Sequence, residues 1–192
     1  MISLAAANQF GAAQGAPLRA GFLIGSVYRM RVTNIPRSEG IEVFPTIEVI
    51  DRLYAPAGQE IRFSIPVELT QEDLEMAIRG RFVTRVIYLE DPQNALPVRS
   101  NPEAQNWFEV GPGRDPLAVA DGLGRPVAIL RLGARVPDQG PDPGFLFGSP
   151  PWVGLPPRPA EPAKPEAVAA PPAQPAPAKP ADEAPAAEKP QP

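Results

Sequence analysis

Carboxylates are the side chains of this 192-residue sequence with the widest chemical potential. The chain has no His and no Cys, and no Lys occurs before residue 137. A serine nucleophile in the first 136 residues therefore has neither of its usual bases. Paired Asp and Glu side chains can act as acid and base without histidine. Six carboxylates are candidates for such a pair: Glu42, Glu48, Asp51, Glu68, Glu90 and Asp91.

Most of these six carboxylates occupy the alternating polar positions of expected strands, or turns between them. A solvated strand face or a turn accounts for an acidic residue at such a position without any catalytic role. We therefore predict no catalytic residue and no bound cofactor. A small carboxylate-dependent hydrolase that acts on a polymer is the alternative.

One acidic loop has the side chains of a calcium ligand set. Glu90, Asp91 and Asn94 follow an expected strand within five residues, and carboxylate and amide oxygens are hard ligands that suit Ca²⁺. Their spacing matches no known calcium loop. A turn in which Asp91 or Asn94 bonds the local backbone needs the same residue types. We predict no metal site, with these three residues as the weak candidates.

Two further groups of side chains suggest binding. Arg79, Arg81 and Arg85 place cations around an expected helix–strand junction, where they can bind an anionic polymer or an acidic partner, although Arg79 is also placed to stabilise a helix C-terminus. Phe145, Phe147 and Trp152 are set among Gly and Pro residues. They either form an exposed docking motif or fold back over the domain.

The elements that position these residues are mostly strands. Apolar residues alternate with polar ones over residues 28–33, 41–49 and 61–65, which predicts three strands. Pro45 within the second run indicates an edge strand, a bulge or a split strand. Arg29 and Arg31 then lie on the polar face, where Glu42 and Glu48 are their expected cross-strand partners. Residues 81–89 are apolar on both faces and predict a central strand, residues 107–110 suit a short strand, and residues 127–132 form the last one.

Two short helices interrupt the strand pattern. Thr70 is an expected cap, Glu72 and Asp73 put acid in the first helical turn, and residues 74, 77 and 78 share an apolar face. Asp115 and Pro116 predict a second helix start, followed by residues 117–123. The predicted fold is mainly β: a single antiparallel β-sandwich-like domain of about six strands with two short helices and a disordered C-terminal tail.

Composition divides the chain and limits its partners. The first 136 residues carry 14 Arg against 15 Asp and Glu, so no basic surplus favours nucleic acid, and no apolar stretch reaches the roughly 18 residues of a membrane span. Of the 29 prolines, 18 lie after residue 136. We predict a flexible leader (1–17), a β-rich domain (18–136), a Gly/Pro/aromatic segment (137–155) and a disordered Pro/Ala-rich tail (156–192).

Four stretches of the chain resemble an uncharacterised bacterial family of planctomycete type. They are residues 28–36 (YRMRVTNIP), 43–53 (VFPTIEVIDRL), 66–70 (PVELT) and 81–92 (RFVTRVIYLEDP). The resemblance covers about residues 18–136. It implies an envelope context and brings no activity or functional residue. The tail separately resembles the Pro/Ala/Lys spacers of envelope-spanning proteins.

These observations predict a non-catalytic binding or structural module of the bacterial cell envelope, with the tail as spacer or tether. Its expected partner is another protein or an envelope polymer. A cytoplasmic adaptor is a further alternative. An envelope or periplasmic location is favoured if a signal peptide lies upstream, and the cytoplasm otherwise. The sequence does not predict an oligomeric state.

Overall fold

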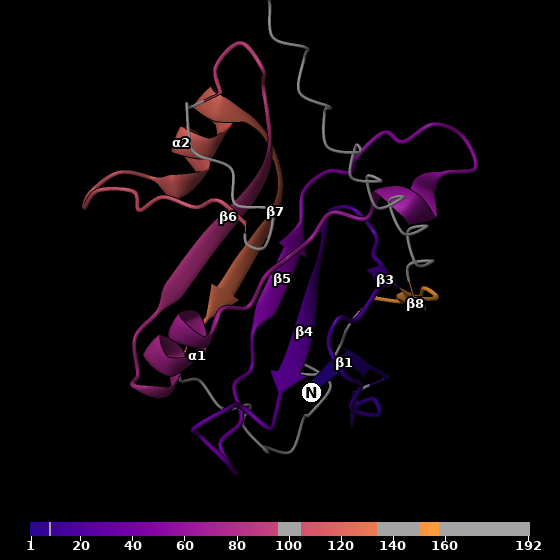
Figure 1. Cartoon of the computed structure of the whole chain (residues 1–192), viewed down its shortest axis with the longest axis vertical. Coiled ribbons are helices and arrows are strands. Elements are labelled where there is room, and N and C mark those ends of the chain that lie inside the picture. Colours follow the sequence, from indigo (N-terminus) through magenta and orange to yellow (C-terminus); the bar gives the residue numbers. More distant parts are fainter. Residues whose placement is uncertain (8, 96–104, 134–149, 158–192) are drawn as a thin grey trace, which may run out of the picture. The chain divides into compact units, whose positions relative to one another are not determined.

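The fold is built on a six-stranded antiparallel sheet with the strand order β2-β1-β4-β5-β7-β6 (Figure 1). The structure is a computed structural model and describes residues 1–7, 9–95, 105–133 and 150–157. In sheet order, the strands are β2 (Gln9–Phe10), β1 (Ile2–Ala6), β4 (Ser26–Val32), β5 (Thr46–Val49), β7 (Gly124–Leu132) and β6 (Val83–Glu90). A second sheet pairs β3 (Ala20–Gly21) with β8 (Val153–Gly154). The helices are α1 (Gln71–Ile78), α2 (Pro116–Leu123) and a short 3-10 helix, η1 (Glu60–Phe63).

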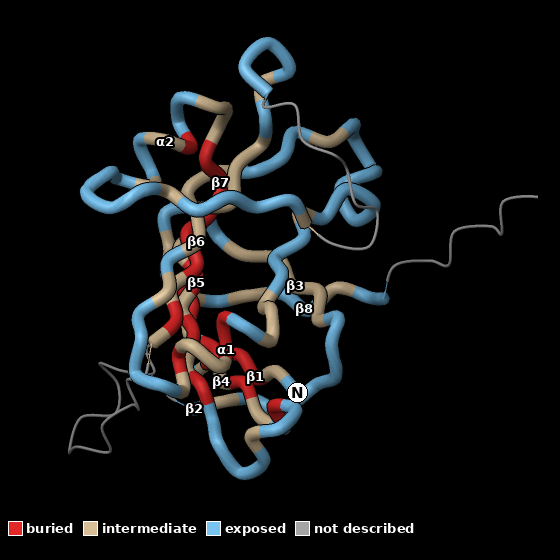
Figure 2. Tube along the Cα trace, turned by 60° about the vertical axis from the view of Figure 1, so that its left-hand side comes forward, coloured by how far each residue is buried: buried red, intermediate tan, exposed pale blue. Residues whose placement is uncertain are grey.

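The core lies on one face of the large sheet. Tyr28, Ile47 and Leu130 are opposite one another on β4, β5 and β7, and all three are buried. Figure 2 shows that buried residues run along these three strands. The buried cluster consists of Leu4, Tyr28, Met30, Val32, Ile35, Val43, Ile47, Leu74, Ala77, Ala128, Leu130 and Leu132. The predicted mainly β, antiparallel class with two short helices is confirmed.

Several elements lie where the sequence predicts them. β4 buries Tyr28, Met30 and Val32 as the alternation requires. The run over residues 41–49 is split at Pro45: its carbonyl accepts a hydrogen bond from the Met30 N–H at 2.9 Å, and β5 begins at the next residue. The helices α1 and α2 and the strand β7 also occupy the expected segments. These elements are encoded by local period and capping residues.

The predicted flexible leader over residues 1–17 differs from the structure. Ile2, Ser3 and Leu4 of β1 pair with β4, and Leu4 and Ala5 are buried. Residues 153–154 form β8, so residues 127–132 are not the last strand. Both additions depend on partners far away in the sequence. A short apolar run does not reveal such partners by itself.

Three strand predictions are wrong in position or type. β6 is an edge strand and not a central one, because β7 lies between it and β5. Residues 61–65 do not form a strand: Ile61 and Phe63 belong to η1 and are exposed. Residues 107–110 adopt no regular structure. Alternation over so few residues does not fix a strand when no neighbouring strand pairs with it.

A small second layer covers the core face beside β4. The Phe22 and Tyr28 rings lie 4.3 Å apart between centroids. The Tyr28 hydroxyl accepts a hydrogen bond from the Leu23 N–H at 2.8 Å and donates to the Pro151 carbonyl at 3.2 Å. Trp152 packs against the core cluster. No helix within the described ranges combines the length and apolarity needed to cross a membrane.

The helix α1 packs on the same face of the sheet, and a buried ion pair holds it there. The Asp73 carboxylate is fully buried and binds Arg85 of β6 with both oxygens: Nε lies 2.7 Å from Oδ2, and the second guanidinium nitrogen 2.8 Å from Oδ1. The Thr70 hydroxyl accepts a hydrogen bond from the Asp73 N–H at 3.1 Å. Asp73 therefore links the first turn of the helix to the sheet, although the sequence predicts it only as a first-turn acid.

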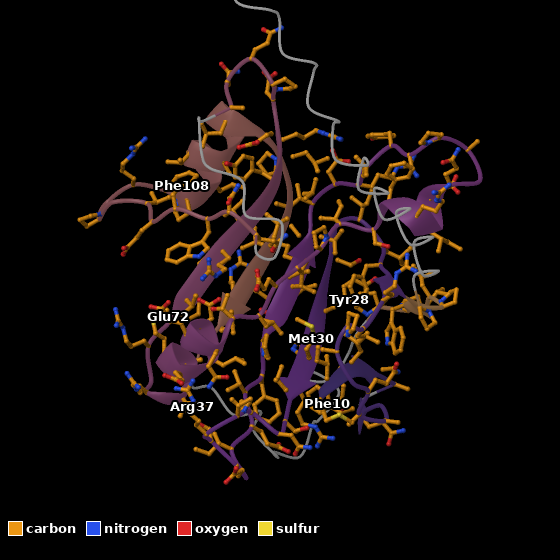
Figure 3. All side chains as sticks on the ribbon, in the orientation of Figure 1. Phe10, Tyr28, Met30, Arg37, Glu72 and Phe108 are labelled. Carbon is orange, nitrogen blue, oxygen red and sulfur yellow. The ribbon has the colours of Figure 1, made fainter. Side chains whose placement is uncertain are left out.

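We expect Asp73→Asn to lower the free energy of unfolding by about 3 kcal/mol, because the change leaves the Arg85 charge without its buried counter-ion. The matched control is Glu72→Gln, one residue earlier on the exposed side of α1, where the expected loss is below about 1 kcal/mol (Figure 3). Urea unfolding measures both values. Equal losses in the two variants would contradict this role of the ion pair.

Candidate functional site

The candidate site begins with the position of Arg85 on β6. Arg85 lies opposite Leu130 of β7, so its side chain is on the core face, where Asp73 holds it. The guanidinium also lies over the Trp107 ring, 4.9 Å from the ring centroid. A cation on an indole face contributes about 0.5–1 kcal/mol at an exposed site. Asp73 and Trp107 together fix the orientation of Arg85, and Arg85 in turn supports the indole.

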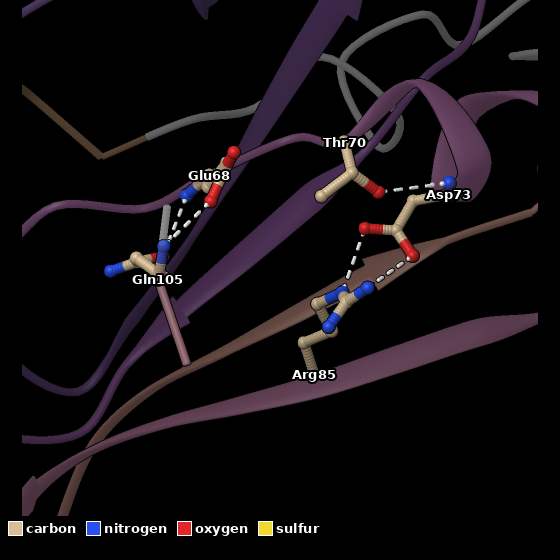
Figure 4. Close-up of polar contacts among 5 residues, drawn as sticks. All are labelled: Glu68, Thr70, Asp73, Arg85 and Gln105. Atoms are coloured by element: carbon tan, nitrogen blue, oxygen red, sulfur yellow. Dashed lines mark hydrogen bonds and ion pairs between the residues drawn. The ribbon is translucent and has the colours of Figure 1, made fainter. Parts of the chain in front are cut away.

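A second contact holds the segment that carries Trp107. The Glu68 N–H donates to Gln105 Oε1 and the Gln105 N–H donates to Glu68 Oε2, both at 3.2 Å (Figure 4). The Gln105 side-chain amide also donates to the Pro66 carbonyl at 2.8 Å. These bonds join two irregular segments, and they anchor the chain two residues before Trp107.

The result is an exposed indole, Trp107, above a guanidinium that is held in place, followed by a second exposed aromatic residue. Trp107 is 59% exposed and Phe108 is 43% exposed. Phe108 lies on the β6 side of the fold, whereas Tyr28 and Met30 lie on β4 (Figure 3). We name this region the Arg85–Trp107 surface, which consists of Glu68, Arg85, Gln105, Trp107 and Phe108. The sequence pattern predicts a short strand for residues 107–110 and gives no sign that Trp107 is exposed above Arg85.

The three arginines of the predicted binding group do not converge. Arg79 is an exposed side chain that pairs with Glu75 across one helical turn at 3.4 Å. Arg81 is exposed and has no side-chain hydrogen bond or ion pair with the described residues. Only Arg85 belongs to the Arg85–Trp107 surface. Of the three predicted aromatic residues, Trp152 packs on the core, while Phe145 and Phe147 lie outside the described residues.

The acidic loop after β6 is organised by its own hydrogen bonds. Asp91 Oδ1 accepts the Gln93 N–H at 3.0 Å, and Oδ2 accepts the Asn94 side-chain amide at 2.9 Å. Asp91 and Asn94, together with Glu90 and Asp121, line a hollow of about 390 Å³. Within the described ranges, no group of three or more His, Cys, Asp or Glu side chains is arranged to hold a metal ion. The geometry is that of a turn.

The other candidate carboxylates lie in separate contacts. Glu42 is 3.8 Å from Arg31, which confirms that expected cross-strand pair. Glu48 instead pairs with Arg131 of β7 at 2.7 Å, because β7 lies directly beside β5. Asp51 pairs with the Arg125 guanidinium. Each of these carboxylates thus has its own cation.

No protein-family model, curated protein or solved structure matches the chain. The resemblance to a planctomycete-type family therefore stays a prediction from the sequence.

Outside the Arg85–Trp107 surface, the pKa of the Asp51 carboxyl group is shifted by its neighbours. The pKa of Asp51 lies below its ordinary value of 3.8, chiefly because the Arg52 N–H donates to Oδ1 at 2.8 Å. Partial desolvation opposes this shift, and the Arg125 guanidinium on the other oxygen adds to it. Both hydrogen bonds favour the charged form of the carboxyl group.

We expect carboxyl NMR to give Asp51 a pKa below 3.8. In Arg125→Gln this pKa should rise without losing the whole shift, because the Arg52 N–H remains in place. A lowered folded-state pKa means that the stabilisation is complete above the ordinary pKa and is lost as the pH falls through the folded-state value. Asp51→Asn should remove this part of the acid sensitivity. Titration of Asp51 at or above 3.8 would contradict the assignment.

Proposed function

We propose that the domain is a non-catalytic binding module that recognises another protein through the Arg85–Trp107 surface. The observation that carries the proposal is a large exposed indole, Trp107, that rests on a guanidinium held by a buried carboxylate. Exposing so much aromatic area costs free energy in water unless a partner covers it. The supports beneath Trp107 keep it in one place, which lowers the entropy lost on binding.

The chemistry of this surface favours a protein partner. Trp and Arg are the residue types that most often dominate protein–protein binding energies. Phe108, the next residue, is also exposed, and the hydrogen bonds between Glu68 and Gln105 place polar atoms two residues before Trp107. An apolar centre with polar groups at its rim is the usual composition of a protein interface.

We further propose that this module lies in the bacterial cell envelope, with the C-terminal residues as a spacer or tether. The support is compositional: residues 156–192 consist largely of Pro and Ala with scattered Lys and Glu, and such segments extend and separate domains. The ion pairs of Glu42, Glu48 and Asp51 give those carboxylates structural partners, which favours binding over the alternative of a carboxylate-dependent hydrolase.

We expect a photo-crosslinking amino acid at position 108 of the full chain to capture one protein in cells of the source organism. Trp107→Ala should abolish this crosslink. With the captured protein purified, the same substitution should weaken the measured affinity about 30-fold, because a central aromatic anchor typically contributes 2 kcal/mol or more.

The matched control is Phe82→Ala. Phe82 is 72% exposed, lies just before β6 and is not one of the residues of the Arg85–Trp107 surface. This variant should crosslink and bind as the unmodified chain does. Equal affinities for the unmodified chain and Trp107→Ala, or crosslinks to glycan alone, would contradict the proposal.

A further inference from the structure

The two edges of the large sheet differ in a way that points to a second interface. One edge is β2, which has two residues, and the other is β6, which has eight. β6 lies at one end of the sheet, beside β7 (Figure 1). Its backbone makes ladder hydrogen bonds to β7, and none to any other described segment. Among the described residues, one row of its N–H and C=O groups therefore has no backbone partner. Such a row is a template for another strand.

The sequence of β6 does not protect this edge. Natural edge strands are blocked by Pro, by Lys, by shortness, by a β-bulge or by an inward-pointing charge that a docking strand would desolvate. The ladder between β6 and β7 has one register shift, between Ile87 and Tyr88, and its extra residue lies on β7 rather than on β6. The strand VTRVIYLE has no Pro, Gly or Lys, and most of its residues have high strand propensity. Its one internal charge is Arg85, and Asp73 already neutralises it. A docking strand thus leaves no unpaired charge.

The charges at the two ends of β6 identify the strand that fits. Arg81 lies two residues before the strand, exposed and without an ion-pair partner among the described residues. Glu90 ends the strand and Asp91 follows it. The edge is thus cationic where it begins and anionic where it ends. An antiparallel copy of the same strand brings each cationic end beside an anionic end.

We propose that two copies of this chain pair through β6 in antiparallel orientation, which makes one continuous sheet across the dimer. In the register centred on Val86, Arg81 of each copy is opposite Asp91 of the other. Val83 is then opposite Leu89, and Val86 is opposite itself. In this register odd-numbered residues are opposite odd-numbered ones and even-numbered residues are opposite even-numbered ones, so a given side chain lies on the same face of the joined sheet in both copies. The two-fold axis is therefore perpendicular to the sheet, and the dimer is closed.

This interface uses the edge of β6, whereas the Arg85–Trp107 surface lies over one of its faces. The dimer therefore leaves both surfaces accessible, and the perpendicular axis puts them on the same side of the joined sheet. Pairing through β6 does not depend on what Trp107 binds. It goes beyond the proposed function and can fail or hold separately from it.

Analytical ultracentrifugation of the full chain over a range of concentrations tests the dimer. The mass should rise toward that of two chains as the concentration increases into the millimolar range. Arg81→Asp and Asp91→Arg, each alone, should weaken the dimer about tenfold or more, because each change puts like charges opposite one another at two symmetric positions.

A mixture of these two variants gives the sharpest outcome. In a heterodimer, Asp at position 81 of one copy faces Arg at position 91 of the other, and the unmodified Asp91 faces the unmodified Arg81. Both pairs are attractive, so the mixture should dimerise although neither variant does so well alone. Circular dichroism of each variant before mixing shows whether it is folded. The sedimentation of each variant alone is then the reference for the mixture.

Arg62→Asp is the matched control, since Arg62 is an exposed arginine on η1, outside the large sheet. It should leave the association unchanged. A chain that stays monomeric at all concentrations would overturn the proposal. So would a dimer that is unaffected by Arg81→Asp, or a mixture of the two variants that associates no better than each alone.

Discussion

The buried carboxylate of Asp73 is the constraint on which the position of α1 and the Arg85–Trp107 surface depend. Removing a carboxylate from water is costly, and both of its oxygens are compensated by one residue, Arg85. A shift of α1 along the sheet would break both hydrogen bonds and leave two charges poorly solvated. The pair thus restricts the helix to one position. The packing of Leu74 and Ala77 on the core follows from that position.

Local sequence patterns are enough to predict those helices and strands that can be identified without knowing which other elements they pack against. The alternation around Tyr28 and the Thr70 cap predict β4 and α1 because period and capping are properties of a few adjacent residues. The order of strands is a long-range property. β6 reads as central because both of its faces carry apolar residues, but these are half covered by other parts of the chain, and a single strand, β7, pairs with it.

The candidate site shows the same limit at the level of single residues. An acid in the first turn of a helix is expected for electrostatic reasons, so the sequence offers no sign that Asp73 is buried. The position of Trp107 depends on two contacts, one between Asp73 and Arg85 and one between Glu68 and Gln105. Each contact joins residues that are 12 or more positions apart in the sequence. Of the predicted binding residues, Arg85 lies in this surface. The sequence places it at the correct junction but does not identify its partners.

One ion pair also connects the face of β6 with its edge. An arginine on an edge strand ordinarily opposes the addition of another strand, because docking would strip water from an uncompensated charge. Asp73 supplies that compensation within the chain and turns the guanidinium toward the face, under Trp107. The interaction that supports the exposed indole therefore also removes the electrostatic barrier at the edge. Both surfaces arise from the burial of one carboxylate.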